Sequence, residues 1–194
     1  MQILCSILGG VWGVRAKSGD KSARSWKNWP VTQTLVLVAA PMTRDNLWAL
    51  AFDGRAPHLQ TRGFAPTDGL AQAFGVELGE EAELAALQMA DVAGLAAGNA
   101  ERLVIVAEVP SSRVVADSQD EAADGAVLVS RLMRDECRAF FTGECDAAVA
   151  QAAEGLGIDA AWELPAVQKL LSDQPLGWHD ISELDAWLGE PYLN

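Results

Sequence analysis

Histidine and cysteine are scarce in this chain, which has two histidines and three cysteines among 194 residues. Cys5, Cys137 and Cys145 are odd in number and have no short paired spacing, so they predict no disulfide framework and fit a reducing compartment. The two histidines and scattered cysteines also lack the spacing of a zinc site. We therefore expect neither a bound metal nor a disulfide scaffold.

Long apolar runs are also missing, since no stretch approaches the roughly 20 apolar residues that cross a bilayer. Residues 3–14 are apolar, but basic residues follow this run and none precedes it. That order is the reverse of a secretory signal. We expect a cytoplasmic protein without a membrane span.

After residue 27 the chain has a single lysine, Lys169. Residues 31–194 carry 9 basic and 26 acidic residues, a balance of −17 within a chain whose net charge is −13. A protein surface with this excess of negative charge repels the phosphates of nucleic acids, so we expect no nucleic-acid partner. Half of the residues are hydrophobic, which predicts a globular protein.

Residues 1–30 differ from the rest, because they hold five basic residues, one acid and three of the seven tryptophans. Three interpretations stay open for this atypical N-terminal segment. It is a mis-assigned start, with the natural one near Val31; a disordered or loosely docked arm; or a specific binding arm. Residues 31–190 are expected to form a single domain.

Apolar patterning in residues 31–190 predicts an α/β fold, a single domain with helices packed on a mixed β-sheet. Strands are expected near 34–40, 62–65, 102–109, 113–116, 127–129, 137–142 and 177–181. Helices are expected near 44–52, 67–75, 80–97, 144–154, 164–171 and 182–189. The order of the strands in the sheet cannot be predicted from these patterns.

The helix expected at residues 80–97 begins with three glutamates, which favour the positive end of a helix dipole. Small residues, with one methionine, form one face, and leucines form a second stripe. Helices that are apolar over so much of their circumference usually pack on two sides. We expect this helix to lie between the sheet and another helix.

Asp91 falls within the leucine stripe of this helix, and Gln88 lies beside it. The interpretation that we favour places Asp91 at the exposed edge of the stripe. The alternative is a buried carboxylate, which needs a partner such as Arg102 or Arg44. In that case Asp91, Gln88 and Arg102 would form a polar pocket under the helix.

Several segments together resemble an uncharacterised family of small proteins found mainly in high-GC Gram-positive bacteria. They are the strand and helix of residues 34–50, the Gly-Phe-Ala-Pro-Thr step at 63–67, the helix that begins Glu-Glu-Ala-Glu-Leu-Ala-Ala-Leu, the strand 103–110 that ends in Val-Pro, and the closing residues 178–184. The resemblance covers about residues 34–188. It implies a cytosolic protein of unknown activity and gives no functional residues to transfer.

Motifs of catalysis are missing as well. The chain has no Gly-x-Ser-x-Gly elbow, dinucleotide fingerprint or phosphate loop, and pairing of Cys137 or Cys145 with His58 or His179 would need a coincidence of the fold. We assign no catalytic, cofactor-binding or metal-binding residue.

The leading hypothesis for function is a non-enzymatic protein that acts by association with a protein partner or with itself. The alternative is a small metal-independent enzyme, hydrolase-like, whose site no motif reveals. A pocket lined by Asp91, Gln88 and arginines would favour the enzyme, and a flat apolar patch would favour association.

Overall fold

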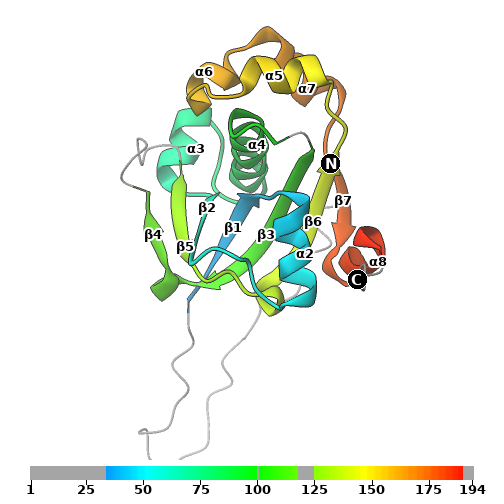
Figure 1. Ribbon diagram of the computed structural model, residues 1–194. Coiled ribbons are helices and arrows are strands. Elements are labelled where there is room, and N and C mark those ends of the chain that lie inside the picture. The colour runs from blue at the N-terminus through cyan, green and yellow to red at the C-terminus, as the bar shows by residue number, and fades with distance from the viewer. Residues whose placement is uncertain (1–33, 100, 118–124, 190–194) are drawn as a thin grey trace, which may run out of the picture. The chain divides into compact units, whose positions relative to one another are not determined.

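A computed structural model describes residues 34–99, 101–117 and 125–189. The expectations for residues 1–30 lie outside this part of the chain. The described residues that follow Thr34 contain one sheet with helices on both of its faces (Figure 1). The predicted α/β class with helices packed on a sheet is confirmed.

The sheet has seven strands in the order β4-β5-β2-β1-β3-β6-β7. Every described pairing is antiparallel, so the sheet is not the mixed one that we expected. Local patterns set where strands occur, whereas strand direction depends on how the chain crosses the sheet. The strands are β1 (Leu35–Pro41), β2 (Gln60–Phe64), β3 (Arg102–Pro110), β4 (Val114–Ala116), β5 (Ala126–Ser130), β6 (Cys137–Gly143) and β7 (Gly177–Asp180).

The helices of the described chain follow most of the predicted ranges, because their caps can be recognised in the sequence. Thr43 and Thr67 each accept a hydrogen bond from the backbone N–H three residues on. The helix α6 was not predicted, and α5 is shorter than expected because Asp146 caps it. The helices are α2 (Arg44–Phe52), α3 (Asp68–Phe74), α4 (Glu80–Ala96), α5 (Ala147–Ala153), α6 (Ile158–Trp162), α7 (Pro165–Asp173) and α8 (Leu184–Leu188).

Short 3-10 turns, η2 (Ser111–Arg113), η4 (Arg134–Glu136) and η5 (Ile181–Glu183), complete the elements. The last helix, which we expected from residue 182, begins two residues later, at Leu184. Asp180 accepts a hydrogen bond from the Ser182 N–H, and the turn η5 precedes α8. The chain therefore enters α8 from the end of strand β7.

Helix α4 lies against one face of the sheet with α3 beside it, and α5, α6 and α7 cover its other side (Figure 1). Ala86 and Ala90 pack against the sheet, while Val92 and Leu95 pack against the outer helices. The predicted packing of this helix on two sides is confirmed. Helices α2 and α8 lie on the opposite face of the sheet.

Candidate functional site

Asp91 on α4 and Arg102 on β3 form a buried ion pair. The Arg102 Nη2 lies 2.5 Å from Asp91 Oδ2, and its Nε donates to both carboxylate oxygens at 3.1 and 3.2 Å. The side chain of Arg102 is 1 % exposed and that of Asp91 is 2 % exposed. The favoured expectation that Asp91 lies at an exposed edge was wrong, because α5–α7 cover that side of α4.

Two opposing effects act on the pKa of Asp91, one from burial and one from Arg102. Removal from water raises the pKa of the Asp91 carboxyl, while the hydrogen bonds and charge of Arg102 act to lower it. Gln88 lies half-buried one turn earlier on α4. Within the described residues, its side chain makes no hydrogen bond with Asp91 or Arg102.

Arg102 also holds two backbone segments that are distant in the sequence. Its Nη1 donates to the carbonyl of Gln174 at 2.8 Å and to that of Glu144 at 3.3 Å. Gly143 permits this approach, since a Cβ there would lie 3.2 Å from Arg102 Nη1 and 2.8 Å from a methyl of Leu176. Arg102 therefore fixes the end of β6 to the segment that precedes β7.

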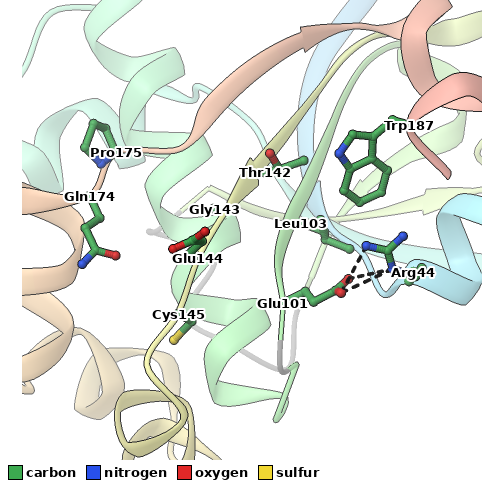
Figure 2. Close-up of a pocket in the computed structure, with 10 residues that line it drawn as sticks. All are labelled: Arg44, Glu101, Leu103, Thr142, Gly143, Glu144, Cys145, Gln174, Pro175 and Trp187. Carbon is green, nitrogen blue, oxygen red and sulfur yellow. Dashed lines mark hydrogen bonds and ion pairs between the residues drawn. The ribbon is translucent and has the colours of Figure 1, made fainter.

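A groove of about 770 Å³ lies beside this clamp. Figure 2 shows Arg44, Glu101 and Trp187 together on one side of it, Gln174, Pro175 and Cys145 on the other, and Thr142 and Gly143 between them. Glu144 and Leu103 complete its lining. None of Asp91, Gln88 and Arg102 lines this groove, although Arg102 holds the backbone of two residues that do.

Arg44, which we considered as a possible partner of Asp91, lines the groove and pairs with Glu101 instead. Its Nε lies 3.2 Å from Glu101 Oε2 and 3.3 Å from Oε1, and its Nη2 lies 3.2 Å from Oε1 (Figure 2). Its Cζ lies 4.5 Å from the centroid of the Trp187 ring. The guanidinium thus contacts an aromatic face and a carboxylate at once.

Thr142, His179 and Glu183 form a second polar group, of which Thr142 lines the groove. Thr142 Oγ1 lies 3.0 Å from His179 Nε2, and His179 Nδ1 lies 3.6 Å from Glu183 Oε2. The imidazole stacks on Phe140 with 4.7 Å between ring centroids. This arrangement resembles the order of nucleophile, base and acid in hydrolases.

The described cysteines are poor nucleophiles in this environment. Burial raises the pKa of the Cys137 thiol to about 12, and it also raises the pKa of the Cys145 thiol. The Cys137 thiol donates to the carbonyl of Met133 and the Cys145 thiol to that of Asp146. His58 is exposed, and His179 has Thr142 as its partner.

Sequence reasoning missed the cluster of Arg44, Glu101 and Trp187, as well as the group around His179. Arg44 and Glu101 lie 57 residues apart, and Thr142 and His179 lie 37 residues apart. No local pattern joins residues at such separations. The charged side chains of Arg44 and Glu101 flank apolar segments and are typical of any solvated helix or strand end.

The described part of the chain contains neither a metal-binding cluster nor a membrane-spanning helix. Within residues 34–99, 101–117 and 125–189, no cluster of three or more histidine, cysteine, aspartate or glutamate side chains has the arrangement to hold a metal ion. No helix in the same residues is long and apolar enough to cross a membrane.

Comparison with known proteins gives a family and no activity. The profile of a family described as a family of unknown function (DUF6912) matches residues 36–188. No curated protein and no solved structure matches the chain.

Proposed function

Because this chain belongs to the family of unknown function DUF6912, its function must be argued from its own geometry, and we propose that it acts by association with a protein partner at the groove. The observation that carries this proposal is the ion-paired clamp beside the groove. Arg102 holds the backbone carbonyls of Glu144 and Gln174, both groove residues, and Asp91 holds Arg102. A surface that is fixed before binding loses little conformational freedom when a partner docks.

Charge supports a protein partner with basic side chains. Residues 31–194 carry a balance of −17, and Glu101 and Glu144 both line the groove. Complementary charge speeds the encounter with a cationic surface, whereas a nucleic acid would be repelled. The cytoplasmic location and the origin in high-GC Gram-positive bacteria are parts of the same proposal, supported by the cysteine usage and by the sequence resemblance.

Site-specific photo-crosslinking in the native host tests the proposal. A photoreactive amino acid replaces Glu144, which lines the groove, and, as the control, Glu163, which is exposed at the end of α6 and does not line it. We expect a discrete crosslinked product from position 144 that position 163 does not give. Identical products from both positions, or none from position 144, would contradict association at the groove.

Hydrolase-like chemistry is the second candidate, and the group of Thr142, His179 and Glu183 favours it. In such a reaction, Thr142 Oγ1 would attack an ester carbonyl while His179 Nε2 accepts the hydroxyl proton. His179 would then return the proton to the departing alcohol, and water would hydrolyse the acyl-threonine to acid and free enzyme. Glu183 would orient the imidazole.

A matched pair of variants separates the two candidates. Thr142→Val keeps the volume of the side chain and removes its hydroxyl, and Thr61→Val makes the same change on β2, away from the groove. Hydrolysis of a p-nitrophenyl ester that falls to background in Thr142→Val alone would favour the enzyme. Equal rates in both variants and the wild type would rule out this nucleophile.

A further inference from the structure

Arg44 fills a slot in the groove that is made by the Trp187 ring and the Glu101 carboxylate. We propose that this slot recognises an arginine side chain of the protein partner, and that Arg44 is an internal occupant which the partner's arginine displaces. The inference deepens the proposed association and rests on it, since it names the chemistry that the groove would bind.

The shape of the slot suits a guanidinium group. Two nitrogens of Arg44 lie 3.2–3.3 Å from the Glu101 carboxylate oxygens, while its Cζ lies over the Trp187 ring, 4.5 Å from the ring centroid. A planar, forked cation can stack on a ring and contact both oxygens of a carboxylate. A lysine ammonium is a compact point charge and cannot satisfy both surfaces in the same way.

The present occupant is held weakly enough to leave. The side chains of Arg44 and Glu101 are 49 and 48 % exposed, and ion pairs of this exposure contribute little to stability. In contrast, Asp91 and Arg102 are sealed from water close by. The groove therefore combines a fixed base with a loosely held cation.

The position of Arg44 in its helix is also unfavourable for local stability. Arg44 is the first residue of α2, directly after the cap Thr43. The N-terminal end of a helix carries partial positive charge, so a cation there is repelled. Arg44 therefore gains no stabilisation from the helix dipole, and in the structure its guanidinium is held by the contacts with Glu101 and Trp187.

Charge around the slot favours a cationic ligand once Arg44 moves out. Glu101 would then face the groove without its cation, and Glu144 lines the same groove. The acidic balance of residues 31–194 adds a long-range attraction for basic segments. An arginine in a short exposed peptide segment meets these requirements.

Binding of a model peptide to the full chain tests the inference. The probe is acetyl-Gly-Arg-Gly-amide, followed by isothermal titration and by the NMR signal of the Trp187 indole N–H. Arg44→Ala empties the slot, and because an internal competitor reduces apparent affinity, we expect this variant to bind the probe at least about 10-fold more tightly than the wild type.

The control variant is Arg138→Ala, which removes the arginine of another exposed pair, with Glu108, outside the groove. It should leave the affinity unchanged. In the Arg44→Ala background, Glu101→Gln should abolish the gain, and peptides with lysine or citrulline in place of arginine should bind at least about 10-fold more weakly.

The outcomes separate this inference from the proposed function. No gain in Arg44→Ala, or equal binding of the lysine and citrulline peptides, would overturn the arginine slot. If crosslinking from position 144 still captures a partner, association at the groove stands without it. If both experiments fail, the groove is not a protein-binding site.

Discussion

The carboxylate of Asp91 and the guanidinium of Arg102 meet at 2.5 Å although both side chains are almost fully removed from water. The two residues are 11 positions apart, at opposite sides of the connection between α4 and β3. Their contact joins the helix to the sheet, and the further bonds of Arg102 extend it to the ends of β6 and α7. One buried pair therefore connects α4, β3 and the ends of β6 and α7 by hydrogen bonds.

Removal of one charge of the Asp91–Arg102 pair should strongly destabilise the folded protein. Asp91→Asn leaves the Arg102 charge buried without its counter-ion, so we expect a loss of about 3–5 kcal/mol in the free energy of unfolding. Chemical denaturation measures it. Glu101→Gln breaks an exposed pair instead and should cost less than about 1 kcal/mol. A similar small loss in Asp91→Asn would mean that Arg102 remains solvated.

A double-mutant cycle tests whether the two groups act together. Asp91→Leu with Arg102→Met removes both charges, so it should cost less than the sum of the two single changes. Some loss should remain, because the carbonyls of Glu144 and Gln174 lose their donor. Simple additivity would show that the pair is not coupled.

Substitution of Gly143 by a larger residue should destabilise the protein, because other side chains lie close to its Cα. Gly143→Ala places a Cβ 2.8 Å from a Leu176 methyl and 3.2 Å from Arg102, and we expect a loss of about 1–3 kcal/mol by overpacking. Gly157→Ala is the control, since a Cβ there meets nothing within 4 Å. Thermal or denaturant unfolding of both variants distinguishes a steric effect from a general effect of replacing glycine.

The small face of α4 should not accept a larger side chain. Ala86 is 0 % exposed and packs against the sheet, so Ala86→Leu should destabilise the protein by about 1–3 kcal/mol. Ala73→Leu makes the same change at an exposed position of α3 and should be nearly neutral. Equal effects at both positions would contradict the close packing of α4.

Glu83 should make stability depend on pH. Burial, and then the charge of Glu80, raises its pKa above the ordinary value of 4.5, and its Oε2 is buried without a hydrogen-bond partner in the structure. Because the folded state then binds the proton more readily than the unfolded state, the contribution of Glu83 is most favourable below pH 4.5 and declines as the pH rises through the raised pKa.

The measurement compares wild type with Glu83→Gln from pH 4 to pH 7 by denaturant unfolding. The wild type should lose stability relative to the variant as the pH rises through this range. Glu77→Gln changes an exposed acid just before α4 and should show no such trend. Parallel curves for wild type and Glu83→Gln would refute the prediction.

The thiol of Cys137 should not react with disulfide reagents in the folded protein. With a pKa of about 12, only a trace of its thiol is ionised at pH 8. In a Cys5→Ser and Cys145→Ser background, we expect a disulfide reagent to label Cys137 only after unfolding by denaturant. Rapid labelling of the native protein would show that this side chain is accessible.

The sequence by itself determined the elements whose signals are local. Thr43 and Thr67 lie where their hydroxyls cap helices, and the small-residue face of α4 predicted its packing on two sides, because both signals act within a few turns. The charge balance and the cysteine usage are likewise properties of the sequence alone.

Only the tertiary structure decided the strand directions, the burial of Asp91 and the composition of the groove. Helical spacing placed Asp91 in the leucine stripe but could not show that α5–α7 cover that side of α4. Arg44, Glu101 and Trp187 come from α2, the residue before β3, and α8. Their contact depends on the register of antiparallel strands and on the packing of α2 against α8. Those are long-range interactions that no local pattern of residues encodes.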